Sequence, residues 1–231
     1  LKKDAKSLVP VQVRIPQLSF AEIKALWPTQ YKDLPAAEWL TEKLSEGTIK
    51  DLKVFLDVDP KNPLAITTEQ VRASFDFENL KADYRAPLIP ASAAKGHATI
   101  EDDALKISVE HGKLADLDVR KASVSVTNLT RPTPGVVNVD VDLDGPLRTI
   151  FDYIGREPIN LQNIIAGEKA SIRGQVEANV HVTFPAIHDL PADAVKVTVD
   201  SRMNDIRLPK IVRGLDLTGG PYTLKVADGS F

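Results

Sequence analysis

Three aspartates spaced two residues apart form the group in this sequence that most suggests metal chemistry. Asp140, Asp142 and Asp144, followed by Gly145, reproduce the first half of a calcium-binding loop, in which alternating carboxylates supply oxygen ligands. The twelfth position of such a loop needs a bidentate glutamate, but here it is Phe151. Apolar residues separate the aspartates, which is typical of a β-strand with one polar face. We therefore interpret the aspartates as the solvated face of a strand and predict no metal site.

The other residue types that could perform catalysis lack the spacing that catalysis needs. No G-x-S-x-G nucleophile elbow, phosphate loop or dinucleotide fingerprint occurs, and the chain has no cysteine. The four histidines do not have the H-E-x-x-H spacing of zinc ligands: His97, His111, His181 and His188. The sequence therefore predicts no catalytic residue and no cofactor, and a protein that is not an enzyme.

The charge of the chain also excludes a class of partner. The 29 basic and 32 acidic residues are spread evenly and give a net charge of −3, so no basic patch for nucleic acid is expected. No apolar run approaches the roughly 20 residues of a membrane-spanning helix, so we expect no direct membrane insertion. Leu1 is not an initiating methionine, and no signal peptide follows it. We expect the chain to be an internal segment of a longer protein.

Alternation of apolar and polar residues is the main structural signal along the chain. Between Val137 and Asp144, valine and leucine alternate with asparagine and aspartate, and the same period recurs in several other segments. These segments are 51–59, 105–109, 122–126, 176–184, 195–199 and 222–226. Strands with one apolar and one polar face form antiparallel sheets that water wets on one side. The predicted fold class is therefore mainly β.

Helical signals are few and short. Ser19 and Glu22 form a capping box that predicts a helix over residues 20–26. A second helix is predicted from Pro35 to Glu46, and a third from Pro146 to Gly155, where apolar residues fall at helical spacing. We expect these helices to cap and connect the strands.

A weak internal repetition suggests how the chain is organised. A glycine, a strand and an Asx-containing turn recur after Gly47, Gly96 and Gly174. Such repetition is typical of units that stack along one axis. We predict one extended segment over 1–231, with possible sub-units 1–95, 96–157 and 158–231.

The apolar faces of the strands have two possible fates. Two such faces can pack together as a sealed sandwich, which is the commoner outcome. Alternatively, one curved sheet can leave its apolar face open as a groove for acyl chains, in which each buried CH₂ contributes roughly 0.8 kcal/mol. The residues alone favour the sandwich.

The segment between Trp27 and Gly96 resembles a known family. Trp27 and Pro28 precede a stretch of the form A-x-x-W-L-x-x-x-L that contains Trp39, and then G-x-I at Gly47. Downstream lie an aromatic strand, a tyrosine with a proline turn, and a Gly-Pro-Leu motif: Phe75, Phe77, Tyr84, Pro87, Gly96, Gly145, Pro146 and Leu147. This pattern resembles YhdP-like members of the AsmA-like superfamily.

The resemblance implies an envelope protein of Gram-negative bacteria that acts in outer membrane biogenesis. Members of that superfamily are anchored in the inner membrane, extend through the periplasm, and consist of repeating β-groove units thought to transport phospholipid. For this chain it implies a periplasmic segment whose partners are phospholipid and the neighbouring repeats of the full-length protein. It also reverses the preference between sandwich and groove, so we expect an extended, curved antiparallel sheet with an apolar concave face.

The expected lipid-contacting residues follow from that choice. They lie on the two most regular strands and belong to the apolar face of each: Val137, Val139, Val141, Leu143, Val176, Val180 and Val182. The alternative function is a structural or assembly scaffold with a sealed β-sandwich core and no lipid cargo.

Overall fold

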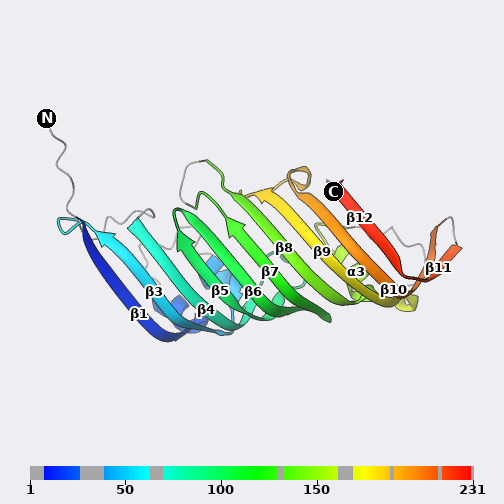
Figure 1. The fold of residues 1–231 in the computed structure, drawn as a ribbon, viewed down its shortest axis with the longest axis horizontal. Coiled ribbons are helices and arrows are strands. Elements are labelled where there is room, and N and C mark those ends of the chain that lie inside the picture. Colours follow the sequence, from blue (N-terminus) through cyan, green and yellow to red (C-terminus); the bar gives the residue numbers. More distant parts are fainter. Residues whose placement is uncertain are drawn as a thin grey trace.

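The computed structural model describes residues 8–26, 39–62, 70–129, 133–160, 169–187, 190–212 and 215–229. In these segments twelve strands form a single antiparallel sheet, shown in Figure 1. The strands are β1 (Val9–Ser19), β2 (Leu44–Ser45), β3 (Thr48–Val58), β4 (Val71–Ala82), β5 (Ala91–Glu101), β6 (Ala104–Leu114), β7 (Leu117–Val126), β8 (Val136–Pro146), β9 (Arg173–Pro185), β10 (Lys196–Val212), β11 (Leu215–Gly219) and β12 (Tyr222–Gly229). The predicted mainly β fold class is confirmed.

Almost every strand pairs with the next strand along the chain. The order across the sheet is β1, then β3 through β11 in sequence, while β2 pairs with β4. The long strand β10 pairs with β12 along its first half, from Val197 to Met203, and with β11 along its second half. The sheet is therefore a meander whose neighbours in space are neighbours in sequence.

The edge strand β1 is absent from the sequence-based expectations. It contains Pro10 and Pro16, and proline normally argues against a strand because it cannot donate to the ladder. At the edge of a sheet this loss is tolerated, because one side of the strand has no protein partner. The register with β3 is continuous from Val9 opposite Val58 to Ser19 opposite Thr48.

Two of the three predicted helices are confirmed. In α1 (Phe20–Leu26) the capping box forms, with the Ser19 backbone N–H donating to Glu22 at 2.7 Å and the Glu22 N–H donating to the Ser19 hydroxyl at 3.2 Å. The helix α3 (Leu147–Ile154) follows Pro146 and is capped by Gly155.

The second predicted helix differs from the structure. Its start lies outside the described residues, and the described part is a π-helical turn, η2 (Trp39–Lys43). The chain then leaves the helix early, because Leu44 and Ser45 pair with Ala82 and Lys81 as β2. Two short 3₁₀ turns, η5 (Lys169–Ser171) and η6 (Ala192–Ala194), complete the described elements.

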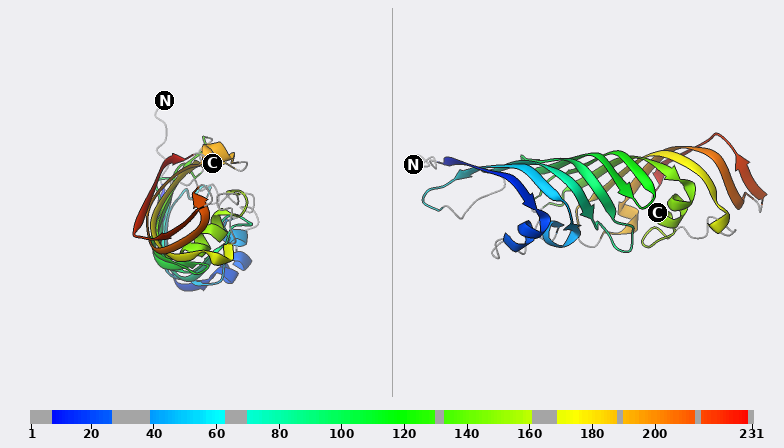
Figure 2. Two further views of the ribbon diagram at one scale, coloured as in Figure 1. Left: turned by 90° about the vertical axis from the view of Figure 1, so that its right-hand side faces the viewer. Right: turned by 90° about the horizontal axis from the view of Figure 1, so that it is seen from below.

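The sheet is long and curved, and α1, η2 and α3 lie on its concave side (Figure 2). The described strands all belong to this one sheet, so they provide no second sheet to seal its apolar face. The sandwich that the residues alone favour is therefore wrong for this part of the chain. The three sub-units stay a prediction; residue 95 lies inside β5, and residue 157 follows α3.

Two buried clusters mark where the concave side is covered. One joins α3 to β9 and β10 and consists of Leu147, Ile172, Val176, Ile206 and Leu208. The other lies on β4 and β5, around Phe77, Ala94 and Ala98. Neither cluster spans the width of the sheet, so most of the concave side has no covering layer among the described residues.

No helix in the described part of the chain is both long enough and apolar enough to span a lipid bilayer.

Candidate functional site: the concave apolar face

The register of the sheet aligns apolar side chains from strand to strand. Val139 on β8 pairs with Val124 on one side and with Val182 on the other. The row that contains it runs through Phe75 and Ala98, Ile107, Val124, Val139, Val182 and Val197. Side chains at paired positions lie on the same face of a sheet. An unbroken apolar row therefore crosses seven strands, from β4 to β10.

A second apolar row lies beside the first. It runs through Phe77, Gly96, Val109, Ala122, Val141, Val180, Val199 and Val226. Neither row contains an ionisable side chain. The seven strands from β4 to β10, spaced about 4.8 Å apart, give these rows a length of roughly 30 Å.

These rows lie on the concave side of the sheet. Val176 belongs to the same face of β9 as Val180 and Val182, because residues two apart in a strand share a face. Val176 packs in one buried cluster with Leu147 of α3, and α3 lies on the concave side (Figure 2). We call the apolar residues on this side the concave face.

The concave face is open along its middle and closed near the helices. Val139, Val141 and Val182 are only half-buried, as are Val124 on β7 and Val197 on β10, which pair with Val139 and Val182; Ala122, which pairs with Val141, is buried. By contrast Val176 is 4% exposed and Leu143 is 6% exposed, at the end of the strands where α3 follows β8. The same face thus combines a sealed margin with an apolar surface that no described residue covers.

A line of elements at the ends of the strands builds that margin. The Asp83 backbone N–H donates to the Lys43 carbonyl at 2.8 Å, which ties η2 to the loop between β4 and β5. The same loop contacts α3 through the hydroxyls of Tyr84 and Tyr153, which are 2.9 Å apart. Tyr84 donates to the Ile89 carbonyl at 2.7 Å, so Tyr153 is the donor to Tyr84. We call η2, the 83–90 loop and α3 the rim.

The two tyrosines form a neutral link. Burial raises the pKa of Tyr84 far above its ordinary value, and the nearby Tyr153 hydroxyl adds to that effect. Burial also raises the pKa of Tyr153. Both hydroxyls therefore keep their protons at any physiological pH, and the link is independent of pH in that range.

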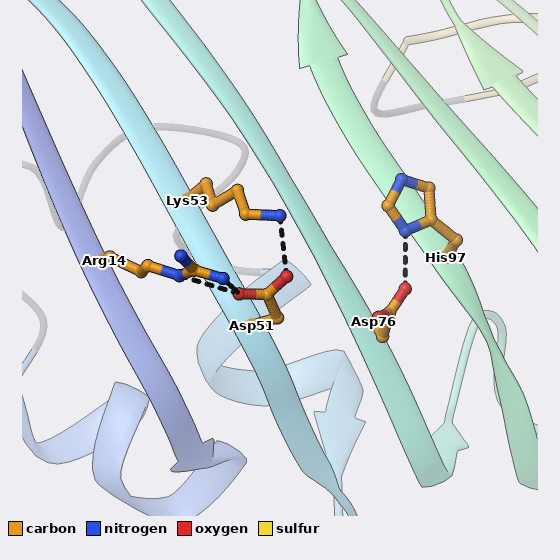
Figure 3. Close-up of polar contacts among 5 residues, drawn as sticks. All are labelled: Arg14, Asp51, Lys53, Asp76 and His97. Carbon is orange, nitrogen blue, oxygen red and sulfur yellow. Dashed lines mark hydrogen bonds and ion pairs between the residues drawn. The ribbon is translucent and has the colours of Figure 1, made fainter.

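The opposite, convex face is polar and crossed by ion pairs. Asp51 accepts from Arg14 at 2.8 Å and pairs with Lys53 at 2.6 Å, which joins β1 to β3 (Figure 3). His97 Nδ1 lies 2.7 Å from Asp76 Oδ1, which joins β5 to β4. Lys53 and then Arg14 hold the pKa of Asp51 below its usual range, so its carboxylate stays charged and paired at neutral pH.

The three aspartates of β8 belong to this convex face. Asp140 lies 2.7 Å from His181 on the next strand, and Asp142 accepts from Asn179 at 2.7 Å. The third, Asp144, pairs with Arg120 at 2.9 Å. Their interpretation as the polar face of a strand is confirmed. No group of three or more acidic or histidine side chains placed to hold a metal occurs among the described residues.

The structure brings the expected lipid-contacting residues onto one face, but in two environments. Val137, Val139, Val141, Val180 and Val182 are half-buried, while Leu143 and Val176 lie in the closed margin. Their role in lipid contact stays a prediction. The expectation did not include the partners of these residues on β4 to β7 and β10, among them Ile107, Val124 and Val199. Alternation marks those residues too, but only the register shows that they continue the same rows.

This arrangement fits noncovalent binding of hydrocarbon. The concave face offers aliphatic side chains and no charge, and burial of each CH₂ of a ligand there is worth roughly 0.8 kcal/mol. Such contacts carry little directional information, so the face can hold a chain without fixing its position along the sheet. The paired backbone groups of the interior strands are not available to a ligand.

Comparison with known proteins adds one finding to this geometry. No curated protein and no solved structure matches the chain. The model of one family, described as YhdP protein, matches residues 4–220, nearly the whole length. An open, curved, antiparallel sheet with an apolar concave face is what the resemblance to that family implies. The chain belongs to the YhdP family.

Proposed function

We propose that the concave face binds the acyl chains of phospholipids and conducts them between the inner and outer membranes of a Gram-negative cell. The observation that carries the proposal is the pair of apolar rows that crosses the sheet and is only half-buried along β8 and the later part of β9. Soluble proteins rarely expose a continuous apolar surface of this extent without a ligand or a partner. Membership of the YhdP family supports the same role.

The dimensions of the concave face support a path rather than a single pocket. Its apolar rows extend for roughly 30 Å across the sheet, about the thickness of a bilayer's hydrocarbon core. Along each row one strand succeeds another with mainly aliphatic side chains, so an acyl chain meets no position that binds it much more tightly than the next. A shallow energy profile along the sheet favours movement over storage.

The place of the segment in the cell is part of the same proposal. The segment lies in the periplasm, other parts of the full-length protein anchor it in the inner membrane, and its neighbours are further β-groove repeats. The headgroups of the bound phospholipids stay in water. They lie at the margin of the concave face opposite the rim, because the rim closes the margin on its own side.

Photocrosslinking along β8 tests the proposal with a built-in control. A photoreactive amino acid replaces Val137, Val139 or Val141 on the concave face, and in parallel Asn138, Asp140 or Asp142 on the convex face. The full-length protein is irradiated in cells and its lipid adducts are identified by mass spectrometry. Adducts should alternate with a period of two along the strand. Equal labelling of both faces, or none on the concave face, would refute lipid binding there.

A further inference from the structure

Phe55 departs from the polar pattern of the convex face. It shares the convex face of β3 with Lys53 and Asp57, and it is 38% exposed. Every other described phenylalanine lies on the concave face or packs against the helices. An exposed aromatic ring on an otherwise polar surface has a large apolar area that water solvates poorly. The exposed Phe55 ring therefore marks a place on the convex face where a ligand could bind.

A shallow depression of about 270 Å³ lies beside Phe55. The Arg72 guanidinium lies over the ring of Phe55, 5.9 Å from its centre, and the other polar residues of the depression are Ser74, Thr99 and Glu101. Thr99 pairs across the strands with Ser74. The depression thus combines one flat apolar ring with hydroxyl groups and with one charge of each sign.

A second depression of about 300 Å³ continues the first towards β7, and Thr99 belongs to both. Its lining is again rich in hydroxyls, because Ser108 on β6 pairs with Ser123 on β7. Because the side chains at these positions are small, the surface there is recessed between the longer side chains of neighbours such as His97 and Lys106. We call the two depressions together the convex valley.

Several hydroxyls of the convex valley have no protein partner. The side chains of Ser74, Thr99, Ser108 and Ser125 make no hydrogen bond to any residue in the described part of the chain. A hydroxyl can both donate and accept. The valley therefore offers a ligand several neutral groups of either polarity, together with the half-exposed guanidinium of Arg72, which also pairs with Asp57 at 3.9 Å.

From this combination we infer that the convex valley binds a glycan chain, with one sugar ring against the part of Phe55 that Arg72 leaves exposed and the next over Ser108 and Ser123. A hexose ring has an apolar face of C–H groups that matches an aromatic ring, and a rim of hydroxyls that matches serine and threonine. The mixture of Arg72 and Glu101 does not select a strongly charged ligand.

Other partner classes fit the valley less well. A peptide strand needs free backbone groups, but β3, β4, β5 and β6 are each paired on both sides. An amphipathic helix needs several apolar anchors along one line, and only Phe55 provides one here. The valley lies on the face opposite the acyl-chain rows, so this inference does not depend on the proposed lipid function.

Titration of the intact protein with a soluble tetrasaccharide of N-acetylglucosamine tests the inference, with calorimetry and NMR as readouts. We expect saturable, weak binding with a Kd near the millimolar range. Phe55→Ser and Ser108→Arg, which remove the ring and fill the second depression, should each weaken binding at least tenfold. Leu224→Ser is the matched control, because Leu224 is 49% exposed near the far edge of the sheet, and it should leave binding unchanged.

Two results would overturn the inference. One is the absence of saturable binding by the wild-type protein, and the other is equal binding by wild type and Phe55→Ser. Circular dichroism of each variant shows whether the fold is kept; since both substituted side chains are on the solvent side, we expect unchanged spectra. Photocrosslinking of lipid to β8 should be the same in Phe55→Ser as in wild type, which separates this test from that of the proposed function.

Discussion

An aspartate introduced at Val139 should abolish lipid binding while leaving the sheet folded, whereas the same change at Val176 should unfold it. Both residues are valines on the concave face, one on β8 and the other on β9. They differ in environment, because Val139 is half-buried in the open middle and Val176 is 4% exposed beneath α3. The pair therefore separates an open apolar face from a sealed one.

The expected magnitudes follow from burial. Full burial of a valine side chain is worth about 1.5–3 kcal/mol, so Val139→Asp should lose roughly 1 kcal/mol, with the new carboxylate still in contact with water. Val176→Asp loses the whole apolar contribution and also places an unpaired charge in a closed cluster, which costs about 3–5 kcal/mol more. That sum approaches the total stability of many domains.

Urea denaturation followed by far-UV circular dichroism gives the free energies of unfolding, and mass spectrometry of co-purified lipid gives the binding. Asn138→Asp is the charge control, since it adds the same carboxylate one residue away on the convex face. It should keep both the fold and the lipid. If Val139→Asp unfolds the protein as Val176→Asp does, then Val139 lies in a sealed core, and the proposal that the concave face binds and conducts acyl chains is wrong.

Three further perturbations test other parts of the structure. Tyr84→Phe should destabilise the protein by about 1–3 kcal/mol in thermal or urea unfolding, because it leaves the Ile89 carbonyl and the Tyr153 hydroxyl without their partner. Tyr153→Phe should cost only about 0.5–1.5 kcal/mol. Equal effects of the two substitutions would contradict the assigned donor order. Gly96→Ala should destabilise by about 1–3 kcal/mol in the same assay, since a Cβ at this position would overlap a backbone carbonyl of β6, and a neutral result would mean that the two strands separate easily. The pKa of Asp51 is depressed in the folded state, so the contribution of its carboxylate to stability is present at neutral pH and is lost as the pH falls below about 4. Asp51→Asn should flatten this part of the stability–pH profile. An unchanged profile would show that the ion pairs of Asp51 contribute nothing to stability.

The sequence was sufficient to predict the strands and helices whose local signals are strong. The alternation from Val137 to Asp144 and the capping box at Ser19 and Glu22 each correspond to an element of the structure. Both signals depend on side chains close together in the chain. For β1 the local signal misleads, because the prolines that argue against a strand are acceptable only at a sheet edge, and sequence does not show which strand is at the edge.

The candidate site was only partly predictable for a related reason. Alternation shows that Val139 and Val182 belong to apolar faces, but the register decides that they lie side by side. Burial is less local still: Val176 and Val180 are the same residue type on the same face of the same strand, and only the docking of α3 distinguishes them. The convex valley depends on small side chains from four strands, which no single segment reveals.

The pairing of nearly every strand with its successor has a consequence for how this protein is made. Few strands must wait for a partner that is far away in the sequence, so each hairpin can form soon after its second strand has been synthesised. Growth then proceeds by adding one strand at a time to an exposed edge, and a stalled or truncated chain keeps a folded beginning. The exceptions are β1, which pairs with β3, β2, which reaches β4, and β12, which returns to β10. At each of these places the earlier strand can pair only after the intervening residues and the later strand have been synthesised.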